Sequence, residues 1–357
     1  MIPKYNKIHL KFKMNGVSLD HDSIPEVAYS CVKEGEPFEK SLGAFLLDWL
    51  DEGPTIGVLT SGSTGEQKTI QVSKQAMVNS SIVTGDYFKL EPGDSALHCL
   101  PTTHIAGKMM VVRAMMLGLE LDVVEPKLNP EFKADKTYSF CAMVPAQLSN
   151  CLGKLNNIET LIVGGAAVNA QLLDEIQGLS TKVCATYGMT ETVSHIALKP
   201  LNYGSESAHF TCLAGITISK DERSCLVIDA PKLSAEQIIT NDIVEIYENN
   251  TFEVLGRFDN MINSGGLKYF PEKIEAKLEG KLPCRYFITS EPDQVLGEQI
   301  VLVLEGESVI VDDSIYGKEF GKFEIPKKTY NVSKFVETPT GKIQRKKTVE
   351  LIKKGAN

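Results

Sequence analysis

The chain has 357 residues, of which 43% are apolar and 23% are charged, and its formal net charge is −9 at pH 7. This composition is typical of a globular protein with its own core, and the length predicts two domains, or one large and one small domain. The acidic balance excludes a general nucleic-acid binder, and no apolar run approaches the roughly 20 residues of a membrane span. We expect a cytoplasmic protein, because the start has no signal-peptide segment and the eight cysteines include no C-x-x-C pair.

Short β-type runs alternate with longer helical stretches up to about residue 255, which predicts α/β layering. The predicted strands are 56–59, 95–100, 119–124, 138–144, 160–163 and 182–186, and the predicted helices are 73–88 and 170–179.

The pattern changes around residues 257–260. A Gly-rich turn, a helix over 271–278, paired strands over 285–289 and 299–304, and a basic helix after Gly341 follow. We therefore expect a large α/β domain over 1–256, a hinge at 257–260 and a small, mobile α+β domain over 261–357.

A glycine- and hydroxyl-rich loop follows the predicted strand 56–59. Its residues are Thr60, Ser61, Gly62, Ser63, Thr64, Gly65, Glu66, Gln67 and Lys68. Backbone N–H groups and hydroxyls in such a loop can bind a phosphate chain, and the lysine supplies a cation for the terminal phosphates. The Walker A pattern fails because Gln67 stands at its second glycine, so we interpret the segment as a phosphate loop of another kind. Taken alone, a flexible surface turn remains the alternative.

Two further polar or glycine-rich segments also follow predicted strands, where α/β sheets gather ligands. They are Gly164-Gly165-Ala166 and Tyr187-Gly188-Met189-Thr190-Glu191. Each of them, read singly, is equally typical of an ordinary strand-to-helix connection.

The order of these motifs resembles that of the adenylate-forming superfamily, which comprises acyl-CoA synthetases, non-ribosomal peptide synthetase adenylation domains and luciferases. The resemblance rests on the phosphate loop and on Leu100-Pro101, His104-Ile105-Ala106-Gly107, Gly164-Gly165-Ala166, Tyr187-Gly188-Met189-Thr190-Glu191, Asp242, Gly256-Arg257-Phe258-Asp259, Gly265-Gly266-Leu267-Lys268-Tyr269-Phe270-Pro271 and Thr340-Gly341-Lys342-Ile343-Gln344-Arg345. The chain is short for this superfamily, with a shortened front end before the loop. That front end and the pair Ser194-His195 look most like the o-succinylbenzoate–CoA ligases of menaquinone biosynthesis.

The resemblance implies an enzyme that uses ATP and Mg²⁺ to convert a carboxylic acid into an acyl-adenylate, and then CoA to form a thioester. Phosphates would bind Thr60, Ser61, Gly62, Ser63, Thr64, Gly65 and Lys68. The base would lie along Gly164, Gly165 and Ala166, beside Tyr187, Gly188 and Met189. Asp242 would accept the ribose hydroxyls, with Arg257 nearby, although Asn241 stands where most relatives have glycine.

Catalytic roles also follow from the resemblance. Thr190 would contact the α-phosphate and Glu191 would hold Mg²⁺, although Glu191 alone is equally typical of a carboxylate at a helix start. Lys342 would bridge the two reacting anions, against the simpler reading as one of many surface lysines in a basic tail. His104 would lie near the acyl carboxylate and the CoA entrance.

The remaining expectations concern motion and substrate. Asp259 would be the hinge, and Gly265, Gly266, Leu267 and Lys268 would shape the CoA tunnel after a domain rotation. Ser194 and His195 would line the acyl pocket, with Lys108 and Arg113 as further polar candidates. The expected partners are an aromatic or acyl carboxylic acid, ATP and CoA, with no nucleic acid, and a homo-oligomer remains open. The alternatives are an adenylation enzyme that loads a carrier protein and a nucleotide-binding regulator without chemistry.

Overall fold

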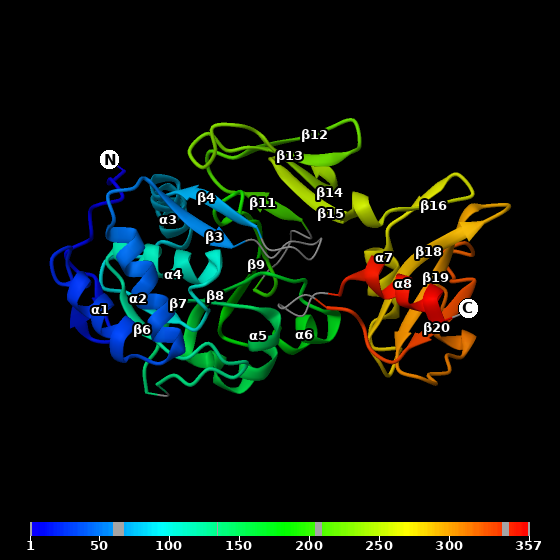
Figure 1. The fold of residues 1–357 in the computed structure, drawn as a ribbon, viewed down its shortest axis with the longest axis horizontal. Coiled ribbons are helices and arrows are strands. Elements are labelled where there is room, and N and C mark those ends of the chain that lie inside the picture. Colours follow the sequence, from blue (N-terminus) through cyan, green and yellow to red (C-terminus); the bar gives the residue numbers. More distant parts are fainter. Residues whose placement is uncertain (1, 60–67, 134, 204–208, 338–342, 356–357) are drawn as a thin grey trace.

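The computed structural model of the chain describes residues 2–59, 68–133, 135–203, 209–337 and 343–355. The termini lie at opposite ends of an elongated molecule, with the first helices at one end and a small sheet at the other (Figure 1). No helix among the described residues is long and apolar enough to cross a membrane.

A twisted sheet of 13 described strands runs through the larger part of the molecule. Across the sheet, the strands are β12 (Thr217–Lys220), β13 (Cys225–Asp229), β14 (Ile238–Tyr247), β15 (Thr251–Arg257), β11 (Phe210–Cys212), β10 (His195–Pro200), β9 (Lys182–Gly188), β8 (Ile158–Val163), β7 (Tyr138–Met143), β5 (Ser95–His98), β6 (Glu120–Val123), β1 (Lys13–Met14) and β2 (Val17–Ser18).

The sheet has a parallel half and an antiparallel half, which meet at β9. The pairings from β1 through β6, β5, β7 and β8 to β9 are parallel, and β2 pairs antiparallel with β1 at that edge. The pairings from β9 through β10, β11, β15, β14 and β13 to β12 are antiparallel. Most residues of β5, β7 and β8 are buried, as helices that cover both faces of a parallel sheet require. The carboxyl end of β9 is only half-buried. The six helices of this part are α1 (Ile24–Glu34), α2 (Pro37–Leu50), α3 (Lys74–Phe88), α4 (Ile105–Leu117), α5 (Pro145–Cys151) and α6 (Ala170–Glu175), all within the described residues.

Several predicted elements are confirmed here. The helix predicted over 73–88 is α3. It begins after Ser73, because the Ser73 hydroxyl caps it by accepting a hydrogen bond from the backbone N–H of Ala76 at 3.3 Å. The strands predicted over 95–100, 119–124, 138–144, 160–163 and 182–186 are β5 to β9 with shifted ends. The helix predicted over 170–179 is shorter than expected, since α6 ends at Glu175 before a turn that contains Gly178.

One predicted strand is confirmed outside the large sheet, and one expectation about the order of elements is wrong. The strand predicted over 56–59 exists as β3 (Thr55–Leu59), but it pairs with β4 (Thr69–Ser73) in a separate antiparallel ribbon outside the large sheet. Its alternation of buried and exposed residues suits such a ribbon, which has one covered face. The alternation of strands and helices also stops at β9 and not near residue 255, because antiparallel strands joined by turns fill the chain from there to Arg257.

The C-terminal part holds a second sheet. Its strands are β16 (Ile262–Ser264), β17 (Leu267–Tyr269), β18 (Tyr286–Asp293), β19 (Gly297–Glu305) and β20 (Lys328–Val332), accompanied by α7 (Pro271–Leu278) and α8 (Arg345–Gly355). The helix predicted over 271–278 is confirmed, and so are the paired strands and the basic C-terminal helix.

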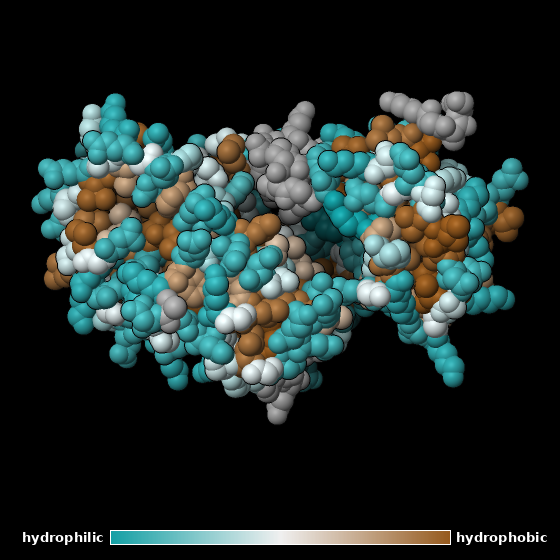
Figure 2. Space-filling model, turned by 90° about the horizontal axis from the view of Figure 1, so that it is seen from below, coloured by the Kyte–Doolittle hydropathy of each residue, from teal (hydrophilic) through white to brown (hydrophobic). Residues whose placement is uncertain are grey.

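The 13-stranded sheet and the C-terminal sheet are packed against separate apolar clusters. Ile262, Ile274, Leu302 and their neighbours form a cluster in the C-terminal part that is separate from the three clusters around the large sheet. Figure 2 shows the molecule from below, where the surface is hollowed between the two parts and hydrophilic residues border the hollow. The division into two domains with a hinge at 257–260 stays a prediction that these separate cores favour.

Candidate active site

A carboxylate on β14, in the antiparallel half of the sheet, has one donor from its paired strand β15 and one from β9. Asp242 on β14 accepts a hydrogen bond from the hydroxyl of Tyr187 at 2.6 Å, and its other oxygen pairs with the Nη1 atom of Arg257 at 3.1 Å. Asp242 and Arg257 lie opposite one another in the register of β14 and β15, and Tyr187 stands at the end of β9. The arrangement therefore brings together the three residues that the sequence assigned to base and ribose.

The environment of Tyr187 is apolar on one side and acidic on the other. Its ring lies edge-on to Phe252 with centroids 5.1 Å apart and tilts against Phe210 at 5.9 Å. Burial, together with the charge of Asp242, raises the pKa of the Tyr187 phenol far above its usual range. The hydroxyl therefore stays protonated at neutral pH and donates to Asp242.

The glycine turn after β8 lies beside the end of β9. A Cβ atom at Gly164 would come within 2.3 Å of the Oγ1 atom of Thr186, and Gly165 has a φ of +86°. Residues with side chains fit neither position without strain. Ala166, the third residue of the motif, is exposed, so this turn offers a flat backbone surface one strand away from Tyr187.

The segment from Gly188 to His195 folds back on itself. A Cβ atom at Gly188 would come within 2.3 Å of the carbonyl oxygen of Ser194. The buried Thr192 hydroxyl accepts from the backbone N–H of Met189 at 2.9 Å and lies 2.7 Å from the Ser194 carbonyl oxygen. Val193 has a φ of +68°, a strained conformation for a β-branched residue.

This folded segment leaves Glu191 exposed and Thr190 half-buried. Sequence reasoning missed Thr192, whose only signal was a second threonine directly after the acid. The described residues contain no group of three or more histidine, cysteine, aspartate or glutamate side chains that could hold a metal. A Mg²⁺ ion held by one carboxylate and by substrate phosphates needs no such group, so Glu191 suits the role that the sequence assigned to it.

The His104 loop packs tightly against the start of α4. A Cβ atom at Gly107 would lie 2.2 Å from the Pro101 carbonyl oxygen, so only glycine allows the helix to come this close to the loop. Burial and the nearby charge of Lys108 lower the pKa of His104, which keeps its imidazole neutral at neutral pH. Lys108 itself is buried, with its ammonium 4.6 Å from the centre of the Phe45 ring.

A buried guanidinium lies farther along α4. Arg113 is 2% exposed, and its Nη2 atom donates to the Ser194 hydroxyl at 2.6 Å and lies 3.5 Å from Nδ1 of His195. His195 in turn contacts the hydroxyl of Thr84 at 3.3 Å. The structure thus joins Arg113, a weak candidate in the sequence, to Ser194 and His195, the two residues assigned to the acyl pocket.

No carboxylate neutralises Arg113 within the described part of the chain. Its Nε atom is buried without a hydrogen-bond partner, and Nη1 meets only the sulfur of Met110, at 3.8 Å. Burial lowers the pKa of the Arg113 guanidinium to about 9. Burial and the charge of Arg113 lower the pKa of His195 well below its usual value. At neutral pH Arg113 is therefore the cation of the pair, and His195 is neutral.

Some predicted residues lie elsewhere or outside the described ranges. Thr60, Ser61, Gly62, Ser63, Thr64 and Gly65, and also Lys342, lie outside the described residues. Lys68 is exposed where the chain enters β4.

The turn assigned to the CoA tunnel lies on the small sheet. Gly265 and Gly266 have φ values of +60° and +82° between β16 and β17, Leu267 and Lys268 are exposed, and a Cβ atom at Gly266 would meet nothing within 4 Å. The turn is therefore not packed against the large sheet.

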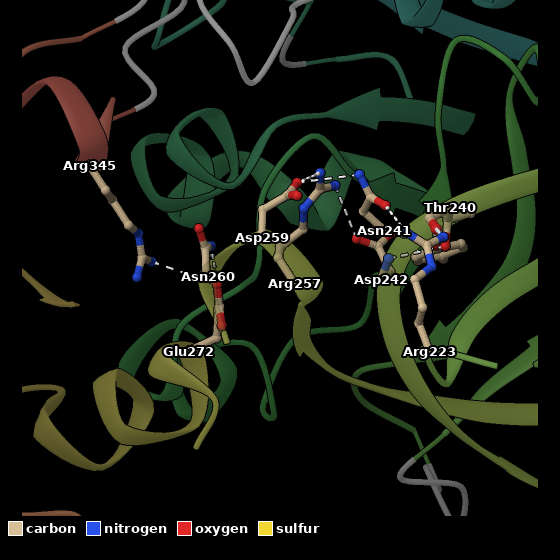
Figure 3. A network of polar contacts seen from close by, with 10 residues as sticks. Arg223, Thr240, Asn241, Asp242, Arg257, Asp259, Asn260, Glu272 and Arg345 are labelled. Carbon is tan, nitrogen blue, oxygen red and sulfur yellow. Dashed lines mark hydrogen bonds and ion pairs between the residues drawn. The ribbon is translucent and has the colours of Figure 1, made fainter. Parts of the chain in front are cut away.

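Asp259 lies in a single 3₁₀ turn (Phe258–Asn260) between the two sheets. Its carboxylate accepts from the Nη2 atom of Arg257 at 3.3 Å, which connects it to Asp242 through one guanidinium (Figure 3). The predicted hinge residue and the predicted ribose acid are therefore parts of one polar network.

Comparison with known proteins supports the same assignment. The model of the AMP-binding enzyme family matches residues 49–218. A solved structure of an AMP-forming acyl-CoA synthetase/AMP-acid ligase II-like protein from Dyadobacter fermentans is 35% identical, with a TM-score of 0.62, and the match covers 92% of this chain and 98% of that one. The chain belongs to the AMP-binding enzyme family, the adenylate-forming enzymes. Within that family it is an AMP-forming acid–thiol ligase.

More distant relatives carry more specific names. The 2-succinylbenzoate–CoA ligase of Bacillus cytotoxicus is 24% identical over 345 residues, which cover 85% of this chain and 71% of that protein. The o-succinylbenzoate–CoA synthetase of Bacillus subtilis, solved with ATP and a magnesium ion, is 19% identical, with a TM-score of 0.71 over 82% of this chain and 69% of that one. The latter likeness shows a shared fold.

Proposed function

We propose that the protein is an ATP- and Mg²⁺-dependent o-succinylbenzoate–CoA ligase that serves menaquinone biosynthesis. In the first step a carboxylate oxygen of the acid attacks the α-phosphorus of ATP, and the bond to the β-phosphate oxygen breaks to release pyrophosphate. In the second step the CoA sulfur attacks the acyl carbon, AMP leaves with its oxygen, and the thiol proton passes to solvent. The products are o-succinylbenzoyl-CoA, AMP and pyrophosphate.

The Asp242 network suits the nucleoside end of ATP. Each carboxylate oxygen of Asp242 has one protein donor and retains a second lone pair, which a ribose hydroxyl can use. The base would lie between the Gly164-Gly165 backbone and the ring of Tyr187, which Phe252 already supports from the side. Binding the ribose at a residue already oriented by two donors requires little reorganisation of the protein.

The phosphates would extend toward Thr190 and Glu191 and toward the loop that precedes Lys68. We assign the α-phosphate contact to Thr190, the magnesium ion to Glu191, and the terminal phosphates to residues 60–68. Lys342 would neutralise the two anions as they meet, an electrostatic contribution of the kind that groups aimed at developing charge supply. His104, neutral and at the start of α4, would orient the reacting carboxylate.

The single observation that carries the choice of acid is the buried, uncompensated charge of Arg113. An isolated buried cation is strongly unfavourable, and an anion that reaches it recovers much of that free energy. o-Succinylbenzoate has a second carboxylate on its ring, which is not activated and needs a partner. The guanidinium of Arg113, with its Nε–H unpaired, supplies a charged donor for it.

Contacts between residues link the proposed α-phosphate site to Arg113, which supports placing the acid between them. Ser194, which Arg113 contacts, packs against Gly188 beside the proposed α-phosphate site. On α4, Ala106, Met110 and Arg113 share one face, with Ala106 exposed and the other two buried. The seven steps from Ala106 to Arg113 correspond to a rise of about 10 Å, which is suited to the length of an aryl acid.

The test is pyrophosphate exchange into ATP with a panel of acids and Mg²⁺, followed by the addition of CoA. We expect exchange that depends on o-succinylbenzoate, and a soluble acyl-CoA once CoA is present. Exchange with fatty or amino acids but not with o-succinylbenzoate would contradict the assigned substrate. Exchange without any thioester on free CoA would instead indicate an enzyme that loads a carrier protein.

A regulator that binds nucleotide without chemistry would show no exchange at all. The same assay therefore separates all three interpretations of the sequence. The small domain acts in the second step of the proposed reaction. In that step the Gly265–Lys268 turn must approach the adenylate to form a CoA tunnel. Asp259 is the residue about which we expect this rotation.

A further inference from the structure

Two consecutive residues of the segment that joins the sheets, Asp259 and Asn260, are hydrogen-bonded to different parts of the molecule. Asp259 is bonded to the large sheet, through Nη2 of Arg257 and Nδ2 of Asn241, each at 3.3 Å. Asn260 is bonded to the small part, because its Nδ2 atom donates to Glu272 on α7 at 2.6 Å. Figure 3 shows the two groups on either side of this junction. We expect a rotation about Asp259 to turn its side chain away from Arg257 and Asn241, so the contacts of Asp259 to the large sheet oppose that rotation.

Asn241 is held on both sides of its amide. Its Oδ1 atom accepts from Nη1 of Arg223 at 3.0 Å, while its Nδ2 atom donates to Asp259. Arg223 also donates to the Thr240 carbonyl oxygen at 3.2 Å and lies over the ring of Phe258, 5.1 Å from its centre. Asn241 thus connects a turn of the antiparallel half of the sheet to the junction.

This connection depends on the side chain of a residue that the sequence marked as unusual. In the Thr-Gly-Asp pattern of the adenylate-forming superfamily, glycine stands at this position, and glycine can make neither contact. Replacing the glycine by asparagine leaves the neighbouring Asp242 in its place, bonded to Tyr187 and Arg257. Asn241 therefore makes a contact to the junction that glycine could not make, beside an acid that keeps its own two donors.

We propose that Asn241 is a positioning residue that holds Asp259 against the large sheet and so favours the domain orientation of this structure over the one that forms the thioester. The inference rests on the proposed two-step function. In the present orientation the Gly265–Leu267 turn stands off the large sheet, with open space around Gly266. Stabilising this orientation therefore opposes the arrival of that turn and retards the second step relative to the first.

Two variants of Asn241 test whether its side-chain amide holds Asp259. Asn241→Asp keeps the shape and the acceptor for Arg223 but replaces the donor to Asp259 by a carboxylate that repels it. Asn241→Ala removes both contacts. The matched control is Asn331→Asp on β20, an exposed asparagine whose amide donates to the Val309 carbonyl oxygen far from the junction. All three variants remain folded if their thermal unfolding midpoints match that of the wild type.

Two half-reactions are measured in single turnovers: pyrophosphate release on forming the adenylate, and thioester formation from preformed adenylate and CoA. We expect the ratio of the first rate to the second to fall roughly threefold to tenfold in Asn241→Asp, less in Asn241→Ala, and not at all in Asn331→Asp, since one partly exposed hydrogen bond is at stake. Small-angle scattering of the unliganded protein should show a shift in the distribution of domain orientations for both Asn241 variants, larger for Asn241→Asp, and none for Asn331→Asp.

Unchanged ratios together with an unchanged scattering profile in both Asn241 variants would overturn the proposal and leave the ligase function intact. Absence of pyrophosphate release from the wild type with any acid would instead refute the ligase function. Scattering still decides the role of Asn241 in that case, because it requires no turnover.

Discussion

Two regions of the active site place charge in opposite ways. Around Asp242 every charged atom has a partner: Tyr187 and Arg257 donate to the carboxylate, and Arg257 reaches Asp259 as well. Around Arg113 the described residues provide no counter-ion for the buried charge and no hydrogen-bond partner for Nε. Both regions adjoin the same folded segment that starts at Tyr187.

This difference in charge pairing indicates which ligand group each region suits. A carboxylate already oriented by two donors can accept neutral hydroxyls without any change in charge, as a ribose requires. A buried cation without a partner is stable only at the expense of the rest of the fold, and an incoming anion relieves it. The paired region therefore suits the sugar of the nucleotide, and the unpaired region suits the second carboxylate of the acid.

The largest expected effect comes from Lys342, the residue that we assign to neutralising the two reacting anions. Lys342→Ala should slow adenylate formation by ~10²–10³-fold, because the variant loses a charge that neutralises the meeting of two anions. Thioester formation from preformed adenylate should persist. Rapid-quench measurement of both half-reactions checks this prediction, and an intact first step would refute the mechanism.

Buried histidines show another way in which a buried polar group exists without a charged partner. His98 is fully buried, its Nδ1 atom has no partner, and burial lowers its pKa to about 4. As pH falls below about 6.5, the unfolded chain takes up a proton that the folded chain refuses, so stability is lost down to about pH 4, by on the order of 3 kcal/mol.

His98→Leu should flatten this dependence. Denaturant unfolding at a series of pH values measures it, with His21→Gln at an exposed site as the control that keeps the wild-type slope. An equal loss of stability on acidification in His98→Leu would show that other groups cause it.

The paired region is sharpened by neutralising its acid. Asp242→Asn should raise the KM for ATP about tenfold, since an amide cannot replace a carboxylate that accepts from Tyr187, from Arg257 and from the ribose. The KM for the acid should change little. Initial rates at varied ATP test this, with Tyr187→Phe as a milder variant of the same cluster, and a selective effect on the acid would break the assignment of the region to the nucleotide.

A variant of the region around Arg113 should have a smaller effect, on the KM for the acid. Ser194→Ala removes the one neutral oxygen, at 2.6 Å, that Arg113 now contacts. We expect the KM for o-succinylbenzoate to rise roughly fivefold through the loss of pocket order, with the KM for ATP unchanged. A larger effect on ATP than on the acid would place Ser194 in the nucleotide site.

Much of the fold was predictable because it depends on local patterns. Short apolar runs marked the parallel strands from β5 to β9, and the boundaries of α7 agree with its predicted range because Pro271 opens the helix and the chain turns at Gly280 after it. The antiparallel strands between β9 and the junction were not predicted. β11 and β12 are at most partly buried, and their polar residues are typical of loops as well. β10 and β13 are mostly buried, and their short apolar runs were missed.

The site was predictable as a set of motifs but not as a set of contacts. Tyr187 and Asp242 were assigned to one nucleotide from their motifs, and they are bonded to each other. The contact of Arg113 with Ser194 joins residues 81 positions apart, and an arginine in an apolar helix gives no sign of its partner. Whether such an arginine meets a carboxylate or remains unpaired is decided by tertiary packing alone.

The most direct measurement compares two acids on two proteins. Pyrophosphate exchange is followed with o-succinylbenzoate and with benzoylpropionate, the same acid without the ring carboxylate, on the wild type and on Arg113→Met. The account predicts that the wild type prefers o-succinylbenzoate by about 10- to 150-fold in kcat/KM, the worth of one charge-assisted hydrogen bond, and that Arg113→Met treats the two acids alike. Equal use of both acids by the wild type, or an undiminished preference in Arg113→Met, would contradict it.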